Sequence, residues 1–317
     1  MKTLKKSSPS RRAAKKLIVV VPAFNEEERI SETLAALRGI RGEIKKMGLE
    51  YRIYVVNDGS SDDTGRCAVD GGADRVLRHK VNQGLGAAVR TGLTGAYRDG
   101  ADIVVKFDAD LQHDPNDIPR LITPILDDES DVVYGNRFER IEYKMPFVRK
   151  AGNIVFTAIM RYLTGWPIRD GQPGIFAVNR DYLDVFDLPG SYNYTQQILL
   201  DAYHKGMRFA HVSVSFRRRI TGKSFVSLRY PFNVLYQIVL VLISVHPMRI
   251  FGTFGILSLF AAAAIFTVEI CLFFAGHLDK PVSHVNAVLG LLFFGLQTLF
   301  FGFLAELIVR NNLDRRC

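Results

Sequence analysis

The stretch Val104–Asp114, which reads VVKFDADLQHD, decides the fold. Its first residues continue a short apolar run from Ile103, and such runs are typical of strands buried in a parallel sheet. The run ends at two carboxylates, Asp108 and Asp110. In open α/β sheets, ligands bind beyond the carboxyl ends of the strands. The sequence therefore predicts a buried strand that carries two acids into a ligand site.

Two neighbouring carboxylates are costly in such a place unless a positive charge meets them. Mg²⁺ and Mn²⁺ prefer oxygen ligands, and Mg²⁺ usually keeps substrate phosphates in its coordination shell. Gln112 offers a further, neutral oxygen two residues after Asp110. We expect Asp108, Asp110 and Gln112 to hold Mg²⁺ or Mn²⁺. The simpler alternative is an acidic turn that only closes a strand, and an Asp-Ala-Asp pattern alone does not exclude it.

The length, composition and net charge of the chain limit the class of protein to which it can belong. Its 317 residues suggest about two domains. The hydrophobic share is 48%, the mean hydropathy is +0.08, and the apolar excess is concentrated after residue 230. A net charge of +9 favours anionic partners such as phosphates, a nucleotide or a lipid surface. The three cysteines are far apart and form no zinc or disulfide pattern, which fits a reducing compartment.

Residues 1–16 form a tail with seven Lys and Arg side chains and no acid. The apolar run that follows, Leu17–Phe24, is short and lacks the cleavage pattern of a signal peptide, so we expect it to be the first strand. The tail is either a solvated arm or a segment that anionic lipids attract.

Strand and helix patterns alternate along the next part of the chain. Strands are expected at 17–23, 51–56, 75–78, 103–107 and 131–134, and helices at 26–46, after 64, from 82 to about 98, from 115, and from 149 to about 163. This alternation predicts an α/β fold with a mostly parallel sheet and helices on both faces.

Polar residues follow several of these strands. Asn25 and Glu26 come after the first strand and Asp58 after the second, so we expect them near Asp108 at one edge of the sheet. The loop at Gly84 is neither a P-loop nor a complete dinucleotide fingerprint. Gly84 either serves a helix start that needs small residues or lets the backbone approach an anion.

Five motifs in order give a specific resemblance: VVVPAFNEEERI, VVNDGSSDDT, NQGLGAAVRTGL, FDADLQHDPNDIPRLI and YGNRF. With them, residues 17–225 resemble a family 2 glycosyltransferase of the GT-A fold. The chain is most similar to the branch of dolichol-phosphate mannose synthases and polyprenyl-phosphate glucosyltransferases. This resemblance implies a GT-A catalytic domain, Rossmann-like, with a mostly parallel sheet.

The resemblance also implies roles for the residues at the strand ends. Nucleotide and diphosphate contacts are expected from Pro22, Asn25, Glu26, Asp58, Gly84 and Arg219, and the metal site from Asp108, Asp110 and Gln112. Arg219 has the Arg-x-x-Gly-x-Ser spacing of a loop that closes near the diphosphate. For Arg217 and Arg218 a basic strand end on a membrane is the better interpretation.

Three residues of the middle segment suit a phosphate. Arg137 ends a strand, while Arg149 and Asn153 are four apart and share one face at a helix start. Such a set can bind phosphate in a bidentate, dipole-assisted way, although a solvated basic face is the alternative. The resemblance implies that these residues hold the phosphate of an acceptor lipid. Arg137 and Arg149 join Asp108 and Asp110 as the expected catalytic residues.

Asp170 and Gln172 precede a further strand and are expected to meet sugar hydroxyls. Relatives have a basic residue after Gly-Phe here, but this chain reads Gly174-Ile175-Phe176. This departure leaves the identity of the sugar open.

Two apolar runs, 250–276 and 285–309, are each long enough to cross the ~30 Å hydrocarbon core of a bilayer. Arg249 precedes the pair, and Arg310, Arg315 and Arg316 follow it, which predicts both ends in the cytoplasm.

The run 233–245 is too short to span the membrane and is expected to be an interfacial or buried helix. Glu269 inside the first run is either functional or a helix-pairing or homo-oligomer contact.

The resulting division is a basic tail at 1–16, a catalytic domain at 17–225, a juxtamembrane segment at 226–249, two transmembrane helices within 250–310, and a cytoplasmic tail at 311–317. We expect an inverting, metal-dependent hexosyltransferase of the cytoplasmic membrane face. Its partners would be GDP-mannose or UDP-glucose and a polyprenyl phosphate, with no nucleic acid.

Two other functions are compatible with parts of this pattern. A processive polysaccharide synthase would carry a Gln-x-x-Arg-Trp motif, but the only tryptophan is Trp166 and it lies in no such motif. A catalytically idle membrane scaffold that binds a nucleotide sugar would not need the intact set of Asp108, Asp110, Arg137 and Arg149.

Overall fold

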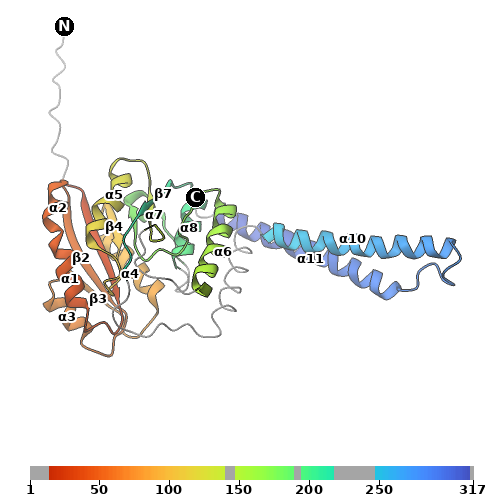
Figure 1. Ribbon diagram of the computed structural model, residues 1–317, viewed down its shortest axis with the longest axis horizontal. Coiled ribbons are helices and arrows are strands. Elements are labelled where there is room, and N and C mark those ends of the chain that lie inside the picture. Colours follow the sequence, from red (N-terminus) through yellow and green to blue (C-terminus); the bar gives the residue numbers. More distant parts are fainter. Residues whose placement is uncertain (1–13, 140–146, 189–193, 218–246, 315–317) are drawn as a thin grey trace, which may run out of the picture. The chain divides into compact units, whose positions relative to one another are not determined.

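The computed structural model describes residues 14–139, 147–188, 194–217 and 247–314 (Figure 1). The chain divides into two compact units, Met1–Phe225 and Val226–Cys317. Arg219 and the run 233–245 lie outside the described residues.

The first unit is built on one seven-stranded sheet with the order β3-β2-β1-β4-β6-β5-β7. Only β6 runs antiparallel to its neighbours β4 and β5. The prediction of a mostly parallel sheet is therefore confirmed. The strands are β1 Lys16–Ala23, β2 Glu50–Asn57, β3 Arg75–Arg78, β4 Ile103–Lys106, β5 Val132–Asn136, β6 Phe176–Asn179 and β7 Phe209–Ser213.

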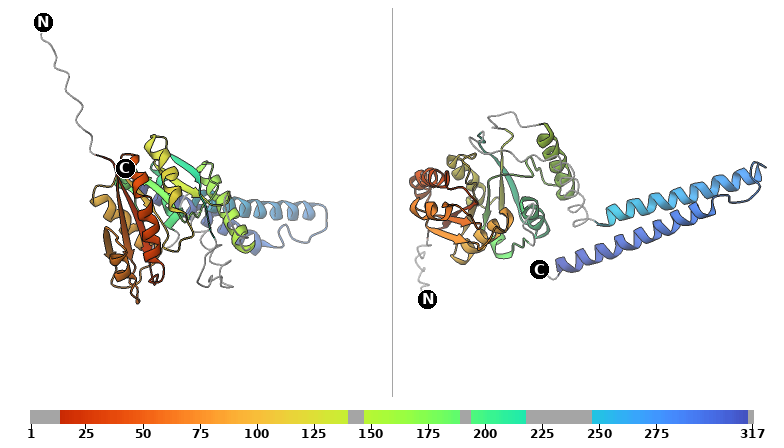
Figure 2. Two further views of the ribbon diagram at one scale, coloured as in Figure 1. Left: turned by 60° about the vertical axis from the view of Figure 1, so that its left-hand side comes forward. Right: turned by 90° about the horizontal axis from the view of Figure 1, so that it is seen from below.

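Helices flank the sheet on both faces (Figures 1 and 2). α1, α2 and α5 contribute to one core, and α4 packs on the opposite side of β1 and β2. The helices of this unit are α1 Ile30–Gly39, α2 Arg41–Lys46, α3 Thr64–Asp70, α4 Leu85–Arg98, α5 Ile118–Leu126, α6 Phe147–Thr164, α7 Arg180–Val185 and α8 Tyr194–His204, with a 3₁₀ turn η1 at Pro115–Asp117.

β1 shows why this sheet is covered on both sides. Leu17 and Val19 join the core beneath α1 and α5, whereas Val20 points toward α4. All three are fully buried. A Cβ on Gly92 of α4 would lie 2.2 Å from Val20 Cγ1, so only glycine lets the helix approach this closely. Each large aliphatic side chain buried in this way stabilises the fold by about 1.5–3 kcal/mol.

The prediction of a single helix over residues 26–46 is wrong in two respects. Its first residues form a turn instead, because Glu26 N donates to Thr64 Oγ1 (2.8 Å) and Glu27 N donates to Asp62 Oδ2 (3.2 Å). These bonds tie the segment to the turn after β2. The remainder is divided at Ile40 into α1 and α2. The helix expected from residue 115 begins as the 3₁₀ turn η1.

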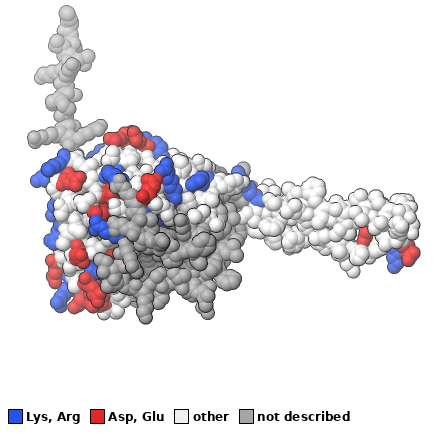
Figure 3. Space-filling model, in the orientation of Figure 1, with Lys and Arg blue, Asp and Glu red and all other residues white. Residues whose placement is uncertain are grey.

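Within its described residues, 247–314, the second unit contains two helices, α10 Pro247–Phe274 and α11 Val285–Asp314, which lie side by side (Figure 2). Both are long and apolar enough to cross a membrane. The visible surface of the pair is almost entirely free of charge between its ends (Figure 3). Cβ atoms on Gly255 and Gly295 would lie 2.9 and 3.0 Å from the carbonyl of the other glycine. Small residues therefore let the two backbones come close, as is common between transmembrane helices.

Glu269 of α10 is buried and binds the start of α11. Its carboxylate accepts hydrogen bonds from the backbone N–H groups of Ser283 (3.0 Å) and His284 (3.2 Å), and it also contacts the His284 ring. A carboxylate at a helix N-terminus is stabilised by the helix dipole and by the otherwise unpaired N–H groups. Glu269 is thus a contact between the two helices of one chain.

Candidate active site

A pocket of about 260 Å³ lies at the carboxyl edge of β1, β2 and β4. Four carboxylates line it, from Glu26, Asp58, Asp108 and Asp110, and no Lys or Arg is among its described lining residues. Pro22 also lines it, so the structure brings three of the six predicted donor contacts together with the two aspartates predicted to bind the metal. This excess of negative charge favours a cation in the pocket.

The turns after β1 and β2 are bonded to each other. Asn25 has a left-handed backbone (φ 53°), its N–H donates to Ser60 Oγ (3.0 Å), and its Oδ1 accepts from Ser61 N (3.0 Å). Asparagine tolerates this conformation better than most residues. Asn25 is exposed and is not among the residues that line the pocket; its side chain instead bonds the turn after β1 to the turn after β2.

Asp58 and Gly84, predicted as separate donor contacts, bind each other. The buried Asp58 carboxylate accepts from Gln83 N (2.9 Å) and Gly84 N (2.8 Å). It also lies 2.6 Å from Nδ1 of His79, whose Nε2 lies 2.9 Å from Thr91 Oγ1. Asp58 therefore holds the loop that opens α4. His79 was not predicted, although its place directly after β3 is a usable signal.

Asp108 has a buried partner that the sequence analysis missed. Lys106 Nζ contacts the Asp108 carboxylate, donates to the Gly174 carbonyl (2.7 Å) and lies 5.6 Å from the ring centroid of Tyr194. Burial alone would lower the pKa of Lys106, but the Asp108 carboxylate outweighs this and the pKa lies above its usual value. Lys106 is therefore a buried cation. A single lysine inside an apolar strand was the available signal.

The loop after Asp108 is tightly constrained. Asp110 Oδ1 accepts from Gln112 N (3.2 Å), and Leu111 between them has φ 58°, an unfavourable conformation for a leucine. Gln112 Nε2 donates to the Arg217 carbonyl (3.2 Å), and Arg217 N donates to the Gln112 carbonyl (2.8 Å). The chain that follows β7 thus returns to the loop that carries the paired acids.

The next residue, His113, is also buried. Its ring lies 5.0 Å from that of Phe216, and a Cβ on Gly174 would lie 2.2 Å from its Nε2. Burial lowers the pKa of His113 to about 4, so the ring is neutral at pH 7. His113 therefore adds bulk rather than charge behind Asp108.

The donor set fits a divalent cation that also binds phosphate. Among the described residues, no cluster of three or more His, Cys, Asp or Glu side chains could hold a metal alone. Asp108 and Asp110 supply two carboxylates in one pocket. Mg²⁺ is commonly held by one or two carboxylates together with substrate phosphates. The residues present therefore suit a metal whose shell is completed by a diphosphate.

A second cluster gathers around Asp170. The fully buried Asp170 pairs with Arg137 (Nε to Oδ2, 2.9 Å) and accepts from Asn153 Nδ2 (3.3 Å) and Gln172 N (3.0 Å). Arg137 Nη2 also donates to the Gln172 carbonyl (2.7 Å). The structure brings together four predicted site residues. It places Asp170 differently from the expectation, because a carboxylate with no exposed surface holds Arg137 and Asn153 and does not face a sugar.

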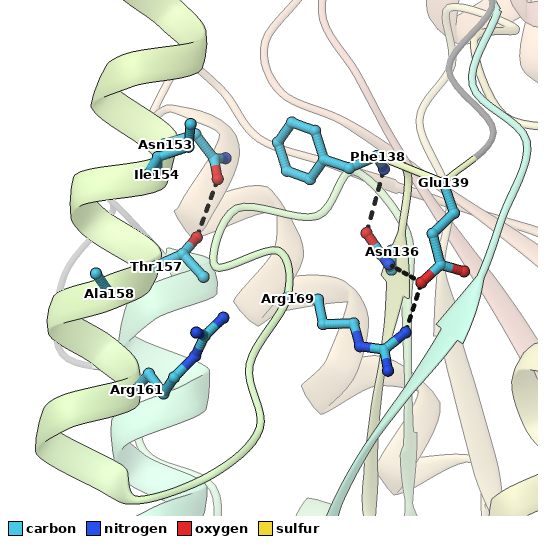
Figure 4. Close-up of a pocket in the computed structure, with 9 residues that line it drawn as sticks. All are labelled: Asn136, Phe138, Glu139, Asn153, Ile154, Thr157, Ala158, Arg161 and Arg169. Carbon is cyan, nitrogen blue, oxygen red and sulfur yellow. Dashed lines mark hydrogen bonds and ion pairs between the residues drawn. The ribbon is translucent and has the colours of Figure 1, made fainter.

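Arg149 lies in the first turn of α6, four residues before Asn153, and its side chain is outside the described part of the chain. A cavity of about 410 Å³ lies beside this helix (Figure 4). One wall comes from α6, where Asn153 Oδ1 accepts from Thr157 Oγ1 (3.0 Å). The other wall includes Asn136 at the end of β5, Glu139 shortly after it, and Arg169 from the loop between α6 and β6; Asn136 and Arg169 both bind Glu139 (Figure 4). Asn153 thus links this cavity to the Asp170 cluster.

A mostly parallel sheet with paired aspartates in a pocket at its carboxyl edge is typical of GT-A glycosyltransferases. The model of the family "Glycosyl transferase family 2" matches residues 18–186. The chain belongs to this family and is a glycosyltransferase, which confirms the resemblance seen in the five motifs.

Three relatives show which kinds of glycosyltransferase the chain is similar to. The chain is 34% identical over 191 residues to the UDP-N-acetylglucosamine–dolichyl-phosphate N-acetylglucosaminyltransferase of Methanococcus voltae. This match covers 55% of this chain and 73% of the relative. It is 31% identical to the dolichol-phosphate mannosyltransferase of Pyrococcus furiosus, over 70% of this chain and 62% of that protein. It is 28% identical to an undecaprenyl-phosphate 4-deoxy-4-formamido-L-arabinose transferase of Klebsiella pneumoniae, and this match covers 95% of this chain and 90% of that protein.

Among solved structures, glucosyl-3-phosphoglycerate synthase from Mycobacterium tuberculosis, crystallised with Mn²⁺ and UDP, is similar with a TM-score of 0.57. The identity is 24%, and the match covers 73% of this chain and 80% of that one. At this identity the match supports the GT-A fold alone.

Proposed function

We propose that this glycosyltransferase transfers a hexose from a nucleotide-diphosphate sugar to a polyprenyl phosphate, with inversion at the anomeric carbon. The observation that carries the proposal is the pocket with Asp108 and Asp110 at the carboxyl edge of the sheet, in a chain that also has two helices apolar enough to span a membrane. Relatives named for dolichyl-phosphate and undecaprenyl-phosphate acceptors support this acceptor class.

The donor would lie in the acidic pocket. Pro22 and Glu26 line it, and Asp58 holds the loop 82–84 at its edge. Asp108 and Asp110 would hold Mg²⁺ or Mn²⁺, which neutralises charge on the leaving diphosphate. Gln112 is a candidate third ligand, and Arg219 a candidate diphosphate contact. Without such compensation, four carboxylates would repel the diphosphate.

The acceptor phosphate would bind to Arg137, Arg149 and Asn153. A phosphate is already anionic at neutral pH, so it can attack the anomeric carbon without a strong general base. The contribution of the protein on this side is then mainly alignment. Asp170 and Gln172 serve that alignment, since both bind Arg137.

The enzyme is proposed to act at the cytoplasmic membrane face, with both ends of the chain in the cytoplasm. Arg249 in the first turn of α10 supports this orientation, together with Arg310 near the end of α11 and Arg315 and Arg316 after it, since short cytoplasmic segments are enriched in Lys and Arg. Reporter fusions at Cys317 and within the loop 278–283 test it. A cytoplasmic signal from the loop would contradict the hairpin.

A transfer assay tests the function. Purified enzyme is offered labelled GDP-mannose, UDP-glucose or UDP-N-acetylglucosamine, each with a polyprenyl phosphate in detergent, with Mg²⁺ or Mn²⁺ or with a chelator. The expected product is a lipid-linked hexose from GDP-mannose or UDP-glucose, which is not formed when the metal is chelated. Transfer from UDP-N-acetylglucosamine alone would contradict a hexose donor. Asp110→Ala is expected to lower turnover by about 100-fold or more, because the diphosphate charge is left uncompensated. Lipid-independent polymer formation would indicate a polysaccharide synthase instead.

A further inference from the structure

Lys106 is the buried cation behind the acidic pocket. Its side chain is 1% exposed, while that of Asp108, which it contacts, is 27% exposed. The other contacts of the ammonium group are the Gly174 carbonyl and the Tyr194 ring, so the lysine is fixed from three sides. β4 anchors its backbone between β1 and β6.

A cation in this place opposes a second cation in the pocket. A divalent ion held by Asp108 and Asp110 would share the Asp108 carboxylate with Lys106. Two positive groups on one carboxylate repel each other, and the low polarity around a buried lysine strengthens that repulsion. Lys106 cannot turn away, because its carbonyl and aromatic contacts hold it. A nucleotide diphosphate would supply the negative oxygens that the two aspartates lack.

We propose that Lys106 weakens divalent-metal binding to the nucleotide-free pocket, so that the metal binds together with the nucleotide diphosphate and leaves with it. This inference rests on the donor site of the proposed function. Lys106 is a positioning residue here, since it acts on the metal through Asp108. By linkage, the metal and the nucleotide should each raise the affinity for the other by the same factor.

The structure offers a matched control in Lys205. Its ammonium lies 2.7 Å from Asp201 Oδ1 and also contacts the Val185 carbonyl, and its side chain is only 12% exposed. Lys205→Met thus removes the same two kinds of contact as Lys106→Met. Asp201 does not line the acidic pocket. Lys205→Met therefore controls for the loss of an ion pair and a carbonyl contact at a place away from the proposed metal.

The test measures Mn²⁺ binding by electron paramagnetic resonance, on the full chain in detergent, with and without UDP or GDP. Wild type is expected to bind Mn²⁺ at least about 100-fold more weakly without nucleotide than with it. Lys106→Met is expected to bind Mn²⁺ about tenfold or more tightly than wild type without nucleotide, which reduces the linkage. Lys106→Arg, which keeps the charge, and Lys205→Met are expected to resemble wild type.

Several results would overturn the inference. Unchanged or weaker Mn²⁺ binding by a folded Lys106→Met variant means that the lysine only orients Asp108. If that variant does not fold, Lys106→Gln replaces it, because glutamine can still donate to Gly174. If neither folds, tight nucleotide-free binding by wild type decides against the inference and nucleotide-dependent binding supports it. If wild type binds no Mn²⁺ even with nucleotide, the donor site itself is wrong.

Discussion

The guanidinium of Arg137 and the carboxylate of Asp170 form an ion pair, with Nε and Oδ2 2.9 Å apart and almost no exposed surface. Asp170→Ala would leave the Arg137 charge buried without its partner, which typically costs about 3–5 kcal/mol. We therefore expect a strong loss of unfolding free energy, measured by denaturant titration in detergent. Asp70→Ala, which removes an exposed ion pair with Arg66, is expected to change it by less than about 1 kcal/mol. Equal losses of unfolding free energy in the two variants would show that the buried ion pair contributes no more to stability than the exposed one.

Arg149 should act on the acceptor and not on the donor. A charge-assisted arginine–phosphate contact is worth about 1.5–3 kcal/mol. Arg149→Ala is therefore expected to raise the acceptor KM or lower turnover by about 10- to 100-fold. Arg149→Lys should restore little of the lost activity, because a lysine cannot form the bidentate contact with the phosphate. Donor affinity, measured without acceptor, should hardly change. An effect on donor binding as large as that of Asp110→Ala would contradict the division between the two sites.

Gly174 separates the two clusters and leaves no room for a side chain. A Cβ there would lie 2.2 Å from His113 Nε2 and 2.7 Å from Asp108 Oδ2. Gly174→Ala must displace one of these groups, so we expect a stability loss of about 1–3 kcal/mol and a large fall in turnover. Gly42→Ala has open space and lies within α2, and is expected to be neutral or slightly stabilising. Thermal unfolding and the transfer assay, run on both variants, check this contrast.

His211 of β7 should make stability depend on pH. Its Nε2 accepts from Arg169 N (2.8 Å), which requires the neutral ring, and burial lowers the pKa of His211 to about 4. Because the unfolded chain takes up the proton near pH 6.5 and the folded chain only near pH 4, stability falls as pH decreases between these values. The loss is about 2 kcal/mol at pH 5.

His211→Gln keeps a donor and an acceptor without titrating, so the pH dependence of unfolding should be flatter in this variant between pH 7 and 5. Parallel curves for the variant and wild type would show that His211 does not contribute.

The sequence predicted the sheet and the acidic pocket because both depend on local patterns. An apolar run such as Ile103–Phe107 identifies a buried strand, and the carboxyl ends of parallel strands meet at one edge. The acids after β1, β2 and β4 can therefore be placed together from the sequence alone.

The missed residues depend on contacts between distant parts of the chain. Lys106 is bound by Gly174 and Tyr194, and Asp58 by His79, and no spacing rule predicts such pairs. The buried position of Asp170 follows from β6, which enters the sheet antiparallel between β4 and β5. Residue type alone suggested a sugar contact there, because burial is decided by packing that the local sequence does not show.

The two apolar helices α10 and α11 have a consequence for how the substrates meet. On the proposed function, they hold the enzyme in the same bilayer that dissolves the acceptor lipid. Enzyme and acceptor then meet by diffusion within the membrane. The rate of encounter would then follow the mole fraction of acceptor lipid in the bilayer and not its amount per volume of solution.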